Sequence, residues 1–98
     1  MHSNQKLTKI IAGRTISGTS QADNLLTITF DDGSVMKIKV APSNTNNAAT
    51  GGKVLKVRQA GTDLELDFVS GGSVQFVTAE ETSSVMLRDR GGNLEYAD

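Results

Sequence analysis

Six charged residues are the candidates for a small-molecule or weakly catalytic site. Paired carboxylates can act as general acid and base or hold a cation, and the chain has two such pairs, Asp31-Asp32 and Glu80-Glu81. A third charged pair lies nearer the end of the sequence. The six candidate ligand-site residues are Asp31, Asp32, Glu80, Glu81, Arg88 and Asp89.

Simpler structural roles account for most of these carboxylates. Asp31 and Asp32 fall in an expected hairpin turn, where an Asp side chain bonds nearby backbone amides, and the segment lacks the spaced ligands of an EF-hand loop. Glu80 and Glu81 are sequence neighbours, so their side chains diverge on either a strand or a helix. The sequence therefore predicts no metal site.

The residues that usually carry catalysis are scarce. The chain has no cysteine, which excludes zinc–thiolate sites, disulfides and thiol nucleophiles. Its single histidine, His2, lies in a polar start (residues 1–6) that we expect to be flexible, whereas a triad or metal site would need it held rigidly. We expect no catalytic residue and no cofactor, and favour a protein that is not an enzyme.

Lys37 and Lys39 are the candidates for contact with nucleic acid. They alternate along one expected strand and would lie on the same face, as on a platform for phosphates. Such platforms usually add exposed aromatic rings, but Phe30, Phe68 and Phe76 fall on the apolar faces. The near balance of 10 Lys+Arg against 11 Asp+Glu also provides no strong field of one sign, so nucleic acid is the less favoured partner.

Short β-hairpins must position these residues. Ten glycines divide the 98-residue chain into runs that are rich in β-branched residues and alternate with period two. The pattern predicts one all-β domain, a small antiparallel sandwich or partly open barrel of about eight short strands. No long amphipathic helix is expected, although Leu7, Ile10 and Ile11 form a brief helical pattern before Gly13.

One hairpin has a register that the residue types specify twice over. A two-residue turn at Gly61-Thr62 sets Arg58 opposite Glu65 and Lys56 opposite Asp67. The same register sets apolar residues against each other on the other face, Val57 with Leu66 and Leu55 with Phe68. A slip of one residue would destroy both patterns.

Three further hairpins follow from glycine turns. A three-residue loop over 31–33 sets Ile28 against Met36 and Leu26 against Ile38. A loop over 70–72 sets Phe68 against Val74 and Leu66 against Phe76, and a tight turn at Arg90-Gly91 sets Leu87 against Leu94 and Val85 against Tyr96. The predicted inward set is Leu26, Ile28, Phe30, Met36, Ile38, Leu55, Val57, Leu64, Leu66, Phe68, Val74, Phe76, Val85, Leu87, Leu94 and Tyr96.

The chain also contains segments that resemble each other. Residues 9–14 resemble 53–58, and 26–30 resemble 64–68, so a duplicated three-strand meander before a C-terminal hairpin is one reading and chance similarity of hairpins is the other. The polar segment 42–52 would join the two halves as a flexible loop. Residues 78–84 are expected to form either one helical turn or a surface loop.

The low apolar share, 37%, predicts a thin core that a second copy could complete. Our leading hypothesis is a non-enzymatic binding or assembly module that acts as a homo-oligomer, with a further protein partner left open. The alternatives are a small-molecule-binding or weakly catalytic barrel and a nucleic-acid platform. The polar N-terminus and short apolar runs predict a cytoplasmic protein with no membrane contact.

Overall fold

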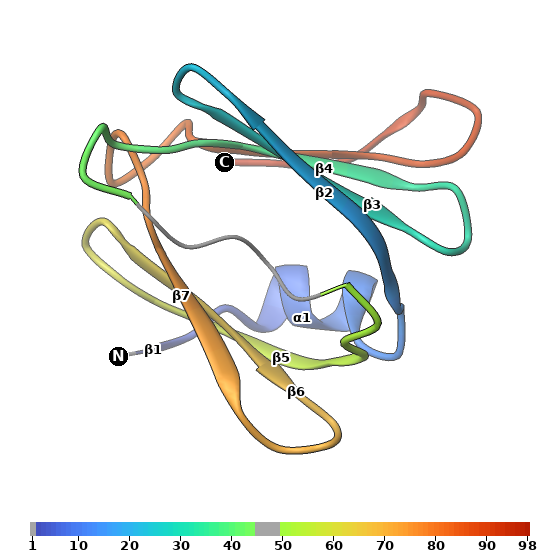
Figure 1. The fold of residues 1–98 in the computed structure, drawn as a ribbon. Helices are drawn as coiled ribbons and strands as arrows, with labels where there is room; N and C mark the ends of the chain where they lie inside the picture. Colours follow the sequence, from blue (N-terminus) through green and yellow to red (C-terminus); the bar gives the residue numbers. More distant parts are fainter. Residues whose placement is uncertain (1, 45–49) are drawn as a thin grey trace.

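The computed structural model, which describes residues 2–44 and 50–98, contains two antiparallel sheets (Figure 1). The four-stranded sheet has the order β1 (His2–Ser3), β5 (Val54–Ala60), β6 (Asp63–Phe68) and β7 (Ser73–Val77). The five-stranded sheet has the order β2 (Ile16–Ala22), β3 (Leu25–Phe30), β4 (Val35–Lys39), β8 (Val85–Arg88) and β9 (Leu94–Ala97). The all-β prediction is confirmed.

The two sheets are joined at two corners and by a short helix. Isolated bridges pair Thr15 with Lys53 and Val40 with Thr78. Helix α1 (Gln5–Ile11) lies between the sheets, and its Leu7 and Ile11 are fully buried (Figure 1). The result is a sandwich with a helix inserted on one side.

Helix α1 begins at a specific cap. The Oδ1 atom of Asn4 accepts a 3.0 Å hydrogen bond from the Leu7 backbone N–H, which satisfies one of the donors left free at a helix start. The Asn4 N–H donates to the Val57 carbonyl at 2.8 Å, and His2 and Ser3 pair with β5. Residues 2–6 therefore lie in β1, the helix cap and the start of α1. The flexibility that the sequence predicts for residues 1–6 is not tested by these contacts.

Three of the hairpins use one kind of loop. In each, a residue N–H donates to the carbonyl four positions on: Phe30 to Ser34 at 2.9 Å, Phe68 to Gly72 at 3.1 Å, and Asp89 to Asn93 at 2.8 Å. The third loop residue is always a glycine with φ between 86° and 95°, the left-handed conformation that glycine adopts without strain. Their loops are residues 31–33, 69–71 and 90–92.

The loop over 31–33 and its register are confirmed, because Ile28 pairs with Met36 and Leu26 with Ile38. The predicted loop over 70–72 is wrong by one position, and Leu66 therefore pairs with Val74 rather than with Phe76. This is a slip of two residues, which keeps every side chain on its predicted face because the strand period is two.

The predicted turn at Arg90-Gly91 is also wrong. The longer loop sets Leu87 against Tyr96, and an irregularity after Leu87 sets Arg88 against Leu94. Leu94, predicted to be inward, is 53% exposed as a result.

The hairpin around Gly61-Thr62 is confirmed over most of its length. Arg58 lies opposite Glu65, and Lys56 lies opposite Asp67. A bulge between Val54 and Lys56 then places Val54, not Leu55, opposite Phe68.

The bulge corrects the predicted face of Leu55, which is 51% exposed. Apart from Leu55 and Leu94, the inward set is buried except Val74, which packs partly buried against the core. The core also contains five residues outside the predicted inward set, namely Leu7, Ile11, Ile16, Val40 and Val54.

The structure does not support the duplication. Residues 9–14 include the end of α1, whereas the similar residues 53–58 lie mostly in strand β5. Residues 78–84 form a loop without a helical turn, as one of the two predictions had it. Of the predicted flexible segment 42–52, residues 45–49 lie outside the described residues.

The bulge in β5 predicts unequal costs for two substitutions. Phe76→Ala should lower the free energy of unfolding by about 3–5 kcal/mol, because Phe76 is fully buried. Leu55→Ala should cost less than about 1 kcal/mol, because the side chain is already half exposed. Urea denaturation measures both, and a large loss for Leu55→Ala would contradict the bulge.

Candidate functional site

Arg14 is the centre of the main charged cluster. It lies between α1 and β2, and its Nη1 and Nη2 atoms donate to the two carboxylate oxygens of Glu95 at 2.8 and 2.9 Å. Nη1 also donates to the Ser34 hydroxyl at 3.0 Å, and Nε lies 3.2 Å from Asp32. The bond to Glu95 is the largest cause of the raised pKa of Arg14, followed by burial, which acts the other way. The cluster ties the segment before β2 to the β3–β4 loop and to β9.

The aspartates beside this cluster are occupied in holding turns. Asp32 Oδ1 accepts hydrogen bonds from the Ser34 hydroxyl at 2.6 Å and from the Ser34 N–H at 2.9 Å, and the hydroxyl bond is the main cause of its lowered pKa. Asp89 Oδ1 accepts from the N–H groups of Gly91 and Asn93, both at 2.9 Å, and these bonds lower its pKa as well. Both carboxylates thus act as turn-forming side chains.

The structure does not bring the six candidate ligand-site residues into one place. Asp31 and Asp32 lie in the loop before β4, at the end of that strand where Val35 pairs with Arg88. Glu80 and Glu81 lie in the connection before β8, near the other end, where Ile38 pairs with Val85. The two carboxylate pairs therefore lie toward opposite ends of the β4–β8 pair.

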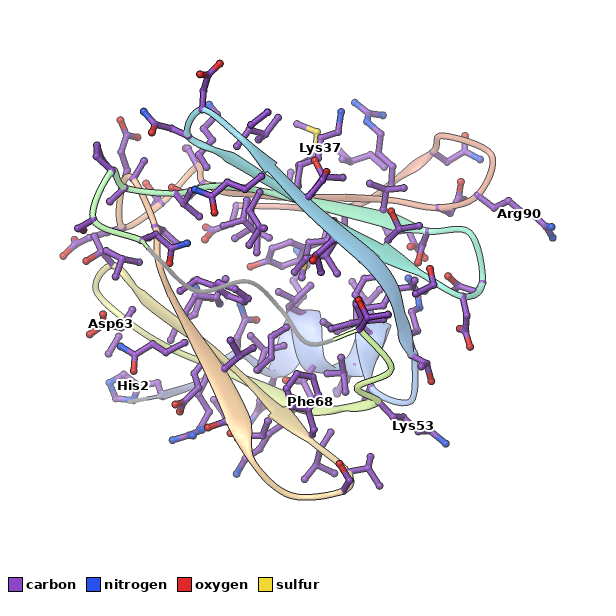
Figure 2. All side chains as sticks on the ribbon, viewed as in Figure 1. His2, Lys37, Lys53, Asp63, Phe68 and Arg90 are labelled. Carbon is purple, nitrogen blue, oxygen red and sulfur yellow. The ribbon has the colours of Figure 1, made fainter. Side chains whose placement is uncertain are left out.

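A second arrangement lies on the outer face of the five-stranded sheet. A hollow of about 410 Å³ opens there, and we call it the outer groove. Its lining residues are Leu25, Lys37, Lys39, Ser83, Ser84, Val85, Met86, Ala97 and Asp98. Lys37 projects from this outer side, away from the four-stranded sheet (Figure 2).

Two rows of paired residues across the sheet build the outer groove. In one, Leu25 on β3 pairs with Lys39 on β4, whose N–H donates to the Ser84 carbonyl at 2.7 Å. In the other, Lys37 on β4 pairs with Met86 on β8, which pairs with Ala97 on β9. The small side chains of Ser84 and Ala97 beside these longer ones leave the surface hollowed.

The end of the groove is formed by a well-bonded loop. The Ser84 hydroxyl accepts a hydrogen bond from the Glu80 N–H at 3.1 Å and lies 3.0 Å from the Glu80 carbonyl, to which it donates. Ser83 has a φ of 60°, a left-handed conformation that costs a non-glycine residue free energy. The hydrogen bonds of Ser84 therefore fix the loop at this end of the groove.

The sequence pointed to only part of this groove. Lys37 and Lys39 were identified by their alternation, but only as nucleic-acid candidates. Leu25 and Met86 were missed, although each stands one position from an inward residue and therefore faces outward by strand alternation. The pairing of β4 with β8, whose partner residues are 47 to 53 positions apart in the chain, had no sequence signal.

A smaller hollow of about 280 Å³ lies beside His2, with Glu81 and Asp98 in its lining. Within residues 2–44 and 50–98, no group of three or more His, Cys, Asp or Glu side chains could hold a metal ion. The described residues around His2 therefore do not provide the set of ligands that a metal centre needs.

Comparisons with protein-family models, with curated proteins and with solved structures found no match to this chain. In the part of the chain that the structure describes, no helix has the length and apolar character needed to cross a membrane.

The Arg14 cluster predicts a specific loss of stability. Arg14→Met should lower the free energy of unfolding by about 2 kcal/mol, because it removes three charge-assisted hydrogen bonds and leaves the Ser34 hydroxyl, which is 1% exposed, with fewer partners. The exposed Lys53 provides a matched control, and Lys53→Met should cost less than about 0.5 kcal/mol. Equal losses in chemical denaturation would show that the cluster contributes nothing.

Asp32 predicts a pH dependence with a defined sign. Because its pKa is lowered from 3.8 in the folded protein, its contribution to stability is complete above its unfolded pKa and is lost as the pH falls through the folded value. Asp32→Asn should therefore reduce stability at neutral pH and flatten the decline below about pH 4. Unfolding curves collected from pH 7 to pH 2.5 measure this, and a parallel decline in both proteins would contradict it.

Proposed function

We propose that this protein is a non-enzymatic binding and assembly module that acts as a homodimer through the edge of its five-stranded sheet. The observation that carries the proposal is the exposed edge strand β9. In the described chain, β9 has β8 as its only neighbour in the sheet, and Leu94 on it is 53% exposed.

The backbone of β9 supports pairing with another strand. Asp98 donates its N–H to the Val85 carbonyl of strand β8 at 3.0 Å, so alternation along the ladder directs the N–H group of the preceding residue, Ala97, to the open side. Unpaired edge groups of this kind are templates for a further strand. β9 contains neither lysine nor proline, the residues that most often protect such an edge.

A two-fold axis is the economical way to satisfy this edge. Two antiparallel copies of β9 would each donate and accept the same hydrogen bonds, and the two five-stranded sheets would become one continuous sheet. Glu95 does not oppose this arrangement strongly, because its charge is paired with Arg14 at 2.8 Å within the chain.

The remaining alternatives have less support. The clustered carboxylates Asp32 and Asp89 hold turns, which argues against acid–base catalysis by them. A nucleic-acid platform through Lys37 and Lys39 would lack stacking rings, because Phe30, Phe68, Phe76 and Tyr96 are all at most 8% exposed.

The proposal predicts a dimer that one edge substitution dissociates. At high micromolar concentration, light scattering should give twice the monomer mass of 10.4 kDa. Ala97→Pro should give the monomer mass, because proline removes the outward N–H and places its ring on the open edge. Ala97→Ser, which keeps the N–H, is the control and should remain dimeric.

Circular dichroism should show the same fold in all three proteins. A wild-type chain that is strictly monomeric at every concentration would overturn the proposal. A dimer that persists in folded Ala97→Pro would overturn the role of β9.

A further inference from the structure

The outer groove combines an apolar floor with unpaired positive charge. Leu25 and Met86, which are 37% and 40% exposed, are two of the largest apolar side chains on the surface, and both line it together with Val85 and Ala97. Exposed apolar surface that is gathered in one hollow favours a ligand that can cover it.

The charges of the groove select the kind of ligand. Lys37 and Lys39 form no ion pair with any described residue, unlike Arg14 and Arg58, whose acidic partners lie on neighbouring strands or loops. Among the described lining residues, Asp98 has the only acidic side chain, and it lines the groove together with the two lysines. An anionic group placed beside the lysines would gain attraction in a partly apolar setting.

We infer that the outer groove binds a small amphiphile with an anionic head and an apolar chain, such as a medium-chain carboxylate. The head lies against Lys37 and Lys39, and the chain covers Leu25 and Met86. The groove volume of about 410 Å³ falls within the range of small-molecule sites. The bonded loop at Ser84 forms the groove in advance, so little ordering opposes binding.

This inference goes beyond the proposed function and does not depend on it. A monomer presents the same lining residues, because all of them belong to one chain. Light scattering recorded on the same samples therefore separates the two proposals. Decanoate binding by a protein that stays monomeric would support ligand binding in the outer groove and would contradict dimerisation through β9.

The experiment compares three ligands that share one chain length and differ in head charge. Decanoate, decanol and decyltrimethylammonium are titrated into the ¹⁵N-labelled protein. The two ionic amphiphiles are kept below their micellar concentrations, and decanol is kept below its solubility limit. Decanoate should shift the amide signals of Leu25, Lys37, Lys39, Met86 and Ala97, and should bind about tenfold more tightly than decanol. Decyltrimethylammonium should bind most weakly.

Variants then test the two parts of the groove. Lys37→Gln with Lys39→Gln should weaken decanoate binding about tenfold and leave decanol binding unchanged. The control replaces two exposed lysines on the other side of the fold, Lys53→Gln with Lys56→Gln, and should bind as the wild type does. Asp98→Asn should tighten decanoate binding, because it removes the one negative side chain of the lining.

Equal affinity for the three heads, amide shifts centred on other residues, or no binding of decanoate would each overturn the inference. A charge-dependent affinity that is lost in the Lys37/Lys39 double variant and kept in the Lys53/Lys56 control would establish it.

Discussion

The insertion of Leu7 and Ile11 between the two sheets is the contact on which the rest of this fold depends. The chain has three Phe residues and no Trp, so two short sheets alone have few large side chains with which to fill the space between them. Helix α1 supplies two fully buried residues there and packs on β5. Its first turn is tied to the other sheet, because Asn4 Nδ2 donates to the Tyr96 hydroxyl at 3.0 Å.

The charged residues divide into two groups with different consequences. Arg58 on the four-stranded sheet is bound by Asp67, with its Nε 2.8 Å from Oδ2, and also by Glu65, while Arg14 is bound by Glu95 and Asp32. These charges stabilise the junctions of the fold and have little capacity left for a ligand. Lys37 and Lys39 have no such partners among the described residues, and they line the outer groove together with Leu25 and Met86. The outer groove is therefore a better candidate for binding than the acidic turns.

The open edge of β9 and the outer groove are neighbouring features with one origin. The β8–β9 hairpin lies at one side of the five-stranded sheet, and it contributes both the free edge and, through Met86 and Ala97, part of the groove lining. A hairpin at the side of a sheet extends the face of the sheet, and the backbone N–H and C=O groups on its outer side have no partner strand. Binding on the face and pairing at the edge can therefore occur together without competing for the same backbone groups.

Most of the local structure can be predicted from the residue types. Turn residues and period-two alternation specified the hairpins at Gly33 and Gly61, and nearly all of the inward residues, because a turn and its flanking pairs are close in the chain and each misalignment would expose apolar side chains. It could not reveal the bulge that exposes Leu55, since two residues opposing one breaks the alternation without any special residue type.

The features that join distant segments arise from tertiary packing. Arg14 and Glu95 are 81 positions apart in the chain. Lys37 lies opposite Met86 because β4 pairs with β8, although the four-stranded sheet's β5, β6 and β7 lie between these two strands in the sequence. Ile16 and Val40 are buried although their neighbours are mostly polar, since the opposite sheet and the corner bridges cover them. Such contacts depend on how complete hairpins and the helix pack together, and no local pattern of residues encodes that arrangement.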